Sequence, residues 1–222
     1  MKYKYIIFDC DGVLVDSEFL ACTTLSEMLL PYGGIIPAEK IMADYVGMKD
    51  VQVVQLLSSL LQLHLPEDFM VQYEKTLDSR LENNLEAIPG IMSVLQNLKI
   101  PNALVSNSNF QRIITSVTSA GLLSYFKKEN IFSPDIAMVA KPDPGIYLYA
   151  LKKLGIKAND AIVIEDSPTG VSAANGAGIE VIGFLAASHS SGQEKALLEN
   201  GAIYIAHNSS ELQLILKEKN IL

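Results

Sequence analysis

The chain has few of the side chains that cross-link secreted domains or bind soft metals. It contains only two cysteines, Cys10 and Cys22, which form no CxxC pair, and three scattered histidines, His64, His189 and His207. So few cysteines exclude a disulfide framework and favour a reducing cytoplasm, and no cluster of His and Cys indicates zinc. We expect the three histidines to be surface or packing residues.

Positive charge and long apolar runs are also scarce. Lysine and arginine number 17 against 25 acidic residues, which gives a net charge of −8, and no basic stripe is present. This composition argues against nucleic acid or an anionic membrane as the main partner. The first apolar run ends at Asp9, which is too short for a signal peptide, and no other run approaches membrane-spanning length. We therefore expect a cytoplasmic protein that does not bind membranes.

What the sequence does contain is a globular pattern, with 49% hydrophobic and 19% charged residues in a chain of 222. Beyond residue 87, short and continuously apolar segments alternate with helical patterns. Such segments indicate strands buried on both faces, and their alternation with helices indicates a parallel sheet between two helical layers. The sequence thus predicts an α/β fold with a Rossmann-like core. The predicted strands are 3–9, 103–106, 131–133, 161–165, 180–184 and 202–205.

The segment between the first two predicted strands differs from the rest. From Asp16 to Glu86 every pattern is helical. The candidate helices cover 17–30, 38–45, 51–63 and 66–85. We therefore predict a Rossmann-like core of residues 1–15 and 87–222 and an inserted, all-helical cap domain of residues 16–86. Because the insertion follows the first strand directly, it is placed as a lid over the strand ends, where parallel sheets bind their ligands.

Polar side chains follow the predicted strands or precede a helix at the same edge of the sheet. They are Asp9, Asp11, Ser106, Asn107, Lys141, Glu165 and Asp166. Because the carboxyl ends of parallel strands share one edge, we expect these side chains to converge in one crevice. Each one alone could instead be a solvated strand end, a turn cap or a surface lysine.

Four carboxylates in one crevice cannot all ionise without compensation, because like charges raise one another's pKa. A single hard divalent cation would compensate this negative charge, and a set of oxygen ligands favours magnesium. Magnesium, Lys141 and the Ser106 hydroxyl would together neutralise the oxygens of a phosphoryl group while it is being transferred. One of the two leading aspartates could attack phosphorus, while the other protonates the leaving group and then activates water. The pattern therefore indicates phosphoryl transfer.

Over essentially its whole length, the chain resembles the haloacid dehalogenase superfamily in its branch of β-phosphoglucomutase-like sugar phosphatases. The resemblance rests on four motifs in the family's order, FDCDGVLVDSE, VSNS, KPDPGIY and VIEDSPTGVSAANGAG. It implies that Asp9 is the nucleophile and Asp11 the acid/base. The implied phosphate-binding residues are Ser106, Asn107 and Lys141, and the implied magnesium ligands are Asp9, Asp11 through its backbone carbonyl, Asp166 and, directly or from the next layer, Glu165.

The helical insertion resembles the family's four-helix C1-type cap, whose loop YVGMKD (45–50) would face the site. Lys49 in that loop is the implied reader of a second anionic group on the substrate. The presence of Asp11 favours phosphate esters over the dehalogenase and phosphonatase branches, which lack this aspartate. The stretches LEAIPG, SNSN and IFSPDIAMVAKPDP are similar to those of bacterial 6-phosphogluconate phosphatases. The implied substrates are therefore sugar phosphates or sugar-acid phosphates such as 6-phosphogluconate.

Two alternatives remain open. A phosphomutase of this branch carries a cap histidine at the position that matches Ala21, and its absence favours transfer to water. A catalytically idle, metabolite-binding regulator on the same fold would have lost Asp9, Asp11 or Lys141, and all three are present. The sequence thus predicts a magnesium-dependent phosphatase of small phosphorylated metabolites that forms an aspartyl-phosphate. We expect it to act as a monomer, with neither nucleic acid nor membrane as a partner.

Overall fold

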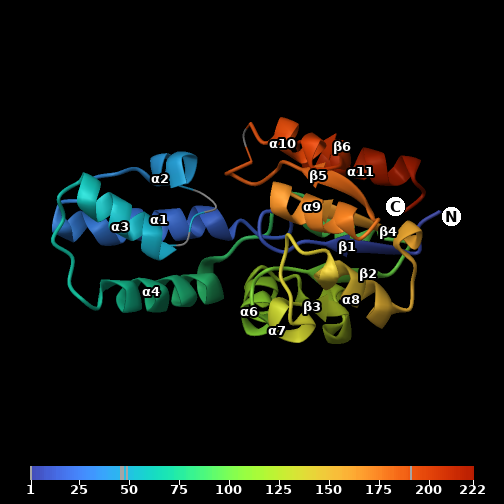
Figure 1. Ribbon diagram of the computed structural model, residues 1–222, viewed down its shortest axis with the longest axis horizontal. Coiled ribbons are helices and arrows are strands. Elements are labelled where there is room, and N and C mark those ends of the chain that lie inside the picture. The colour runs from blue at the N-terminus through green and yellow to red at the C-terminus, as the bar shows by residue number, and fades with distance from the viewer. Residues whose placement is uncertain (1, 46–47, 49, 191) are drawn as a thin grey trace.

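The computed structural model describes residues 2–45, 48, 50–190 and 192–222, and its larger lobe is built on a parallel β-sheet (Figure 1). In the described residues the sheet has six strands in the order β3-β2-β1-β4-β5-β6, all parallel. The strands are β1 (Tyr5–Phe8), β2 (Asn102–Val105), β3 (Ile131–Phe132), β4 (Ala161–Glu165), β5 (Glu180–Phe184) and β6 (Ala202–Ala206). This arrangement confirms the predicted α/β fold.

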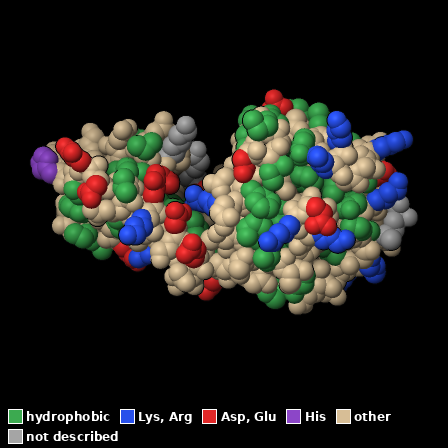
Figure 2. Space-filling view, turned by 90° about the horizontal axis from the view of Figure 1, so that it is seen from below, with side chains coloured by type: hydrophobic (Ala, Val, Ile, Leu, Met, Phe, Trp, Pro, Cys, Tyr) green, Lys and Arg blue, Asp and Glu red, His purple; other side chains and the backbone are tan. Residues whose placement is uncertain are grey.

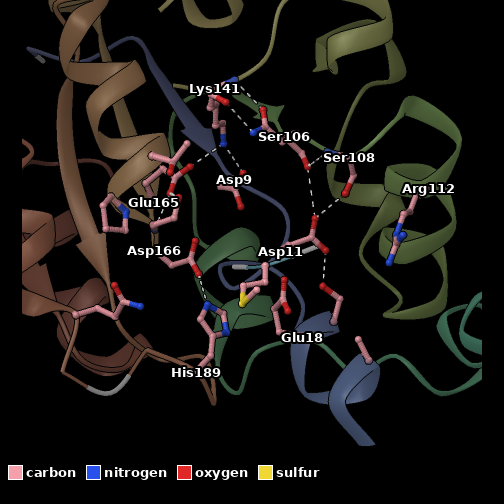
Figure 3. A pocket seen from close by; sticks show the side chains of 18 of the residues that line it. Asp9, Asp11, Glu18, Ser106, Ser108, Arg112, Lys141, Glu165, Asp166 and His189 are labelled. Carbon is pink, nitrogen blue, oxygen red and sulfur yellow. Dashed lines mark hydrogen bonds and ion pairs between the residues drawn. The ribbon is translucent and has the colours of Figure 1, made fainter. Parts of the chain in front are cut away.

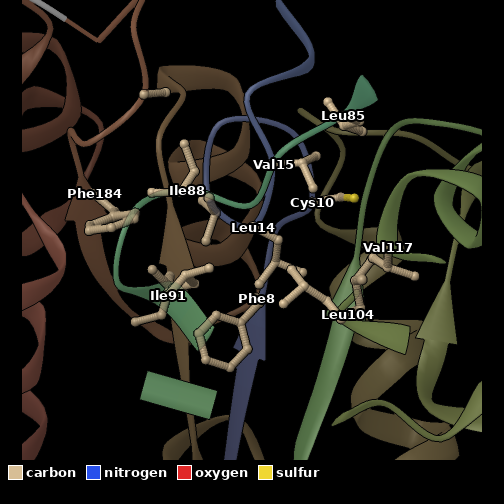
Figure 4. Close-up of a cluster of buried hydrophobic side chains, with 14 of the residues drawn as sticks. Phe8, Cys10, Leu14, Val15, Leu85, Ile88, Ile91, Leu104, Val117 and Phe184 are labelled. Carbon is tan, nitrogen blue, oxygen red and sulfur yellow. The ribbon is translucent and has the colours of Figure 1, made fainter. Parts of the chain in front are cut away.

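The apolar runs of the strands are explained by helices on both faces of the sheet. Along β1, Ile6 and Phe8 enter one core cluster and Ile7 enters the other, as the alternation of side chains in a strand requires. On the first face lie α5 (Ile91–Gln96), α6 (Phe110–Ser119) and α11 (Ser209–Glu218). On the second lie α8 (Gly145–Leu154), α9 (Pro168–Gly176) and α10 (Glu194–Glu199). Figure 4 shows the first cluster, with Phe8 between Ile91 and Leu104.

Four helices form a smaller lobe that stands apart from the sheet (Figure 1). They are α1 (Ser17–Leu29), α2 (Ala38–Tyr45), α3 (Asp50–Leu60) and α4 (Phe69–Asn84). Their apolar faces pack on one another through buried side chains such as Leu25, Leu57 and Tyr73. The chain passes between the lobes twice, and the two connecting segments form an antiparallel β-bridge between Val15 and Ala87. These residues lie beside the limits that we propose for the cap domain.

Short elements and helix ends are where the observed boundaries depart from the predicted ones. The helix predicted at 66–85 begins only at Phe69, and the one predicted at 51–63 ends at Leu60. The chain also forms α7 (Pro134–Ala137) and the 3-10 turns η1 (Leu30–Tyr32), η2 (Leu123–Tyr125), η3 (Lys128–Asn130) and η4 (Ala158–Asp160). Segments of three or four residues are too short to show a helical period, so the sequence pattern does not predict them.

Asp16 connects the cap to the core at the start of α1. Its Oδ1 accepts a hydrogen bond from the Phe19 N–H at 3.4 Å, and its Oδ2 accepts one from the Ser188 N–H at 2.9 Å. The carboxylate therefore caps the helix N-terminus and ties it to the loop that follows β5. Within the described part of the chain, no helix combines the length and apolar character that crossing a bilayer requires.

Both cysteines are buried thiols. Burial raises the pKa of Cys22 to about 12, and it raises the pKa of Cys10 well above its usual value. Because the thiolate is the reactive form, we expect neither thiol to react with Ellman's reagent within minutes in the native protein, and both to react once it is unfolded in guanidinium. Rapid release of one equivalent of thionitrobenzoate from the native protein would contradict this burial.

Candidate active site

The carboxyl end of β1 places Asp9 on the floor of a pocket. The backbone N–H of Asp9 still donates to the Ile164 carbonyl of β4 at 3.0 Å, so the sheet fixes its position. Only 6% of the residue is exposed, and burial raises its pKa well above the usual value, while Lys141 opposes that rise. A tight turn follows, in which Gly12 takes a φ of +83° and donates to the Val15 carbonyl at 2.7 Å.

Lys141 lies among the strand ends as a buried cation. Its Nζ donates to Asp9 Oδ1, to the Val105 carbonyl at 2.9 Å and to Glu165 Oε1 at 2.7 Å. Although burial works against the charged form, the two neighbouring carboxylates raise the pKa of Lys141 well above its ordinary value. Lys141 is thus a fixed positive charge beside Asp9 (Figure 3).

Asp11 has different partners from Asp9. Its Oδ1 accepts from Ser17 Oγ at 2.5 Å, and its Oδ2 accepts from Ser108 Oγ at 3.0 Å. Ser106 Oγ lies at 3.5 Å from the same Oδ2 and also accepts from the Ser108 N–H at 3.0 Å, so Ser106 both faces the site and caps its turn. Ser17 and Ser108 are site residues that the sequence reasoning missed, although both stand inside the quoted motifs DSE and VSNS.

Asn107 and Glu165, predicted as a phosphate ligand and a metal ligand, use their side chains to position Lys141. Asn107 accepts from the Lys141 N–H at 2.8 Å and donates to its carbonyl at 3.1 Å. Glu165 Oε1 accepts from Lys141, and Oε2 accepts from the N–H of Ser167 at 2.9 Å and from its hydroxyl at 3.0 Å. Direct contact of either side chain with a phosphate or a metal stays a prediction.

A glycine in α9 leaves the space that Glu165 occupies. A Cβ added at Gly170 would lie 1.6 Å from Glu165 Oε1, so Gly170→Ala must displace this buried carboxylate from Lys141. We expect a loss of about 1–3 kcal/mol in the free energy of unfolding, together with a fall in activity. Gly176→Ala in the same helix is the control, because its Cβ would meet its nearest neighbour, Pro144, at 3.3 Å. Equal melting temperatures of the two variants would contradict the account.

Asp166 is buried beside the turn at Gly12 and contacts His189. His189 Nε2 lies 2.8 Å from Asp166 Oδ2, and a Cβ at Gly12 would lie only 1.8 Å from that same oxygen. Burial raises the pKa of Asp166 to about 6, against the opposing effect of His189. The expectation that His189 is a surface or packing residue was therefore wrong. It sits in the loop after β5, outside every motif, so no sequence signal marks it.

The oxygen donors at this edge fit a hard cation. Carboxylates of Asp9 and Asp166 and the backbone carbonyl of Asp11 are oxygen ligands of the kind that Mg²⁺ takes together with waters and substrate phosphate. Glu165, Asp166 and Asp11 each add to the rise in the pKa of Asp9, so the cluster carries excess negative charge. Across the described ranges no group of three or more His, Cys, Asp and Glu side chains is placed to hold a metal ion by itself. These protein oxygens therefore fit Mg²⁺ only in combination with waters and substrate oxygens.

The pocket is a cavity of about 600 Å³ between the core and the cap. Figure 3 shows Asp9, Asp11, Lys141 and Asp166 on its core side. The cap contributes Ser17, Glu18, Ala21, Met48 and Asp50. The first turn of α6 contributes Arg112, which was not among the predicted site residues. The prediction for Lys49 falls outside the described residues. The other predicted site residues all line this one cavity.

The sequence profile of the family described as "Haloacid dehalogenase-like hydrolase" matches residues 6–184 of the chain. The chain belongs to this family. The match spans every residue predicted for the site, from Asp9 to Asp166, and the fold is the one that the family resemblance implied.

Individual relatives of this hydrolase are named phosphatases. It is 27% identical over 193 residues to the 6-phosphogluconate phosphatase of Escherichia coli, covering 85% of each chain. It is 30% identical over 220 residues to the phosphorylated carbohydrates phosphatase of Thermotoga maritima, covering 96% of this chain and 98% of that one. A solved HAD family hydrolase from Deinococcus radiodurans, with bound phosphate and sodium, superposes with a TM-score of 0.89 at 30% identity, over 100% of this chain and 98% of that one. These names and the family identify the chain as a phosphoric monoester hydrolase.

Proposed function

We propose that this hydrolase is a Mg²⁺-dependent phosphatase of small phosphorylated metabolites, sugar phosphates or sugar-acid phosphates such as 6-phosphogluconate, acting through an aspartyl-phosphate. The observation that carries the proposal is the contrast between the two carboxylates at the end of β1. Asp9 is buried against Lys141, whereas Asp11 is hydrogen-bonded only by serine hydroxyls within the described residues. Two neighbouring carboxylates in different environments are suited to different catalytic roles.

In the proposed reaction, a carboxylate oxygen of Asp9 attacks phosphorus, and the bond from phosphorus to the ester oxygen breaks. Asp11, protonated at this stage, gives its proton to the departing alkoxide. In the second step Asp11 takes a proton from water while the water oxygen attacks phosphorus, which releases phosphate and frees Asp9. Lys141, the Ser106 hydroxyl and the backbone N–H of Asn107 would neutralise the oxygens of the transferring group.

The metal would be held by Asp9, Asp166 and the Asp11 carbonyl, with Glu165 behind them as the buried partner of Lys141. When bound, Mg²⁺ supplies positive charge to the carboxylates and to the phosphate oxygens. The chain itself fixes the position of the Asp166 carboxylate. Gly12 leaves room for this side chain, and His189 contacts its Oδ2. The solved relative from Deinococcus radiodurans holds a phosphate and a sodium ion, which supports the binding of an anion and a cation by this fold.

Removal of divalent metal should abolish turnover reversibly. After incubation with EDTA we expect phosphate release to fall by about 10²-fold or more, because the excess negative charge around Asp9 then repels the phosphate. Addition of Mg²⁺ beyond the chelator should restore the rate, and Ca²⁺, which prefers more ligands at longer distances, should not. Full activity in EDTA would contradict a metal-dependent mechanism.

The substrate class is tested by a phosphate-release screen across sugar phosphates, sugar-acid phosphates and nucleotides, with and without Mg²⁺. The names of the two relatives and the 600 Å³ cavity both support a molecule of the size of a hexose phosphate. We expect hexose phosphates and their acids to be turned over faster than nucleotides. No release from any compound would overturn the proposal.

Ala21 supports transfer to water over a phosphomutase reaction. It lines the pocket from α1 with a methyl group, which cannot shuttle a proton. Product analysis decides between the reactions, because a mutase would return isomerised sugar phosphate in place of free phosphate. The monomeric state and the cytoplasmic location remain predictions from the sequence.

A further inference from the structure

The two arginines of the chain have contrasting surroundings. Arg80 lies within the cap, where its guanidinium donates to Glu27 at 2.5 Å and to Thr24 at 3.2 Å. Arg112 is half-buried in the wall of the active-site cavity. Within the part of the chain that the structure describes, its guanidinium has no hydrogen-bond acceptor and no carboxylate within 4.0 Å. Arg112 therefore offers unused donors to whatever occupies the cavity.

The position of Arg112 relates it to the leaving group of the substrate. It stands in the first turn of α6, where the Asn109 side chain caps its N–H at 2.9 Å. This helix follows β2 and the two serines, Ser106 and Ser108, that face Asp11. In Figure 3, Arg112 lies beyond Ser108 and Asp11 when viewed from Asp9. A substrate with its phosphorus at Asp9 and its ester oxygen at Asp11 would extend toward Arg112.

The cap wall of the same cavity is acidic. Glu18 and Asp50 line it, and burial raises the pKa of Glu18. Partial desolvation raises the pKa of Asp50, and the positive charge of Arg112 opposes that rise, so the two side chains lie close enough to interact. An adjoining cavity that shares Asp50 and Arg112 adds Glu74 and Asp78 of α4, and carboxylates are prominent on the small lobe in Figure 2. Carboxylates accept hydrogen bonds from hydroxyl groups and repel anions.

We infer that Arg112 binds a carboxylate at the end of the substrate remote from the phosphate, and so selects phosphorylated sugar acids over neutral sugar phosphates. A guanidinium can hold a carboxylate through two parallel hydrogen bonds, which a lysine cannot reproduce. The acidic cap residues would accept from the hydroxyls between the two anionic ends. This inference rests on the proposed phosphatase function and names the substrate class of its site.

The test compares 6-phosphogluconate with glucitol 6-phosphate, which replaces the carboxylate by a neutral CH₂OH and otherwise keeps the chain of hydroxyls. Phosphate release is measured for the wild type, Arg112→Met, Arg112→Lys and Arg80→Met. We expect the wild type to prefer the acid in kcat/KM, and Arg112→Met to lower the ratio of the two kcat/KM values by about 10- to 100-fold. The loss should fall mainly on KM for the acid, because the contact is the same before and during phosphoryl transfer.

The remaining variants separate a specificity residue from a structural one. Arg112→Lys should restore only part of the ratio, and Arg80→Met should leave it unmoved, because Arg80 is paired inside the cap. If Arg112→Met lowers kcat/KM equally for both substrates, Arg112 has a structural role and the inference is overturned. The inference is also overturned if the substitution changes neither value. If the wild type releases phosphate from neither substrate nor from any other in the screen, the proposed function itself fails.

Discussion

Asp9→Asn should lower kcat/KM for phosphate release by a factor on the order of 10⁴ or more. The amide retains the size and shape of the carboxylate but cannot attack phosphorus, so no aspartyl-phosphate forms. The nearby carboxylates cannot take over, because Glu165 is held by Lys141 and Ser167, and Asp166 contacts His189. Steady-state release of inorganic phosphate from the best substrate of the screen measures the effect.

The same variant should remain folded, which separates loss of chemistry from loss of structure. Burial raises the pKa of Asp9, so at neutral pH the ionised side chain is less favourable in the folded state than in the unfolded one. A neutral Asn removes that cost, and Lys141 keeps Glu165 as its buried ionic partner, so its charge stays compensated. We therefore expect a melting temperature in metal-free buffer that is equal to or above that of the wild type. Retained turnover in Asp9→Asn would remove Asp9 from the role of nucleophile.

Lys141→Met should be the most destabilising substitution at the site. It leaves Asp9 and Glu165 facing each other without their shared cation, and it leaves the Val105 carbonyl without the Nζ donor. Removing one partner of a buried ion pair costs about 3–5 kcal/mol, which corresponds to a fall of roughly 6–20 °C in melting temperature for a chain of this size. Thermal unfolding followed by circular dichroism measures the shift, and activity should be lost together with stability.

A double variant tests whether the loss of stability comes from uncompensated charge. Lys141→Met combined with Glu165→Gln should regain part of the stability lost in Lys141→Met, without regaining activity. Lys195→Met is the surface control, because Lys195 is 86% exposed and lies 3.6 Å from Glu199, and its effect should stay within about 0.5 kcal/mol. If the stability changes of the Lys141 and Glu165 substitutions simply add, the two side chains are not coupled through their charges.

The sequence could predict those features that depend on local pattern and on parallel topology. A continuous apolar run such as Ile6–Phe8 is kept away from water when it forms a strand that is buried on both faces of a sheet. Once the strands are parallel, the residues that follow them must meet at one edge, which is why Asp9, Ser106 and Asp166 line one cavity. The strand-end residues on the core side of the candidate site could therefore be predicted from the parallel sheet.

The contacts that the sequence could not predict depend on loops and on the cap. His189 reaches Asp166 from a loop after β5, and nothing in the spacing of these residues indicates their contact. Arg112 enters the cavity because α6 turns its first residues toward the cap, which depends on how the two lobes pack. Side-chain direction also decided the partners of Glu165, since a strand-end carboxylate can face a metal or a lysine with the same sequence around it.

The central claim is that Asp9 carries the phosphoryl group during turnover, and trapping that intermediate tests it most directly. The enzyme is mixed with excess substrate and Mg²⁺, quenched within one turnover and treated with borohydride, which reduces an acyl phosphate to an alcohol. Peptide mass spectrometry then locates the reduced side chain. We predict homoserine at position 9, dependent on both substrate and metal. Turnover without any modification at position 9, or with the modification at another carboxylate, would contradict the account.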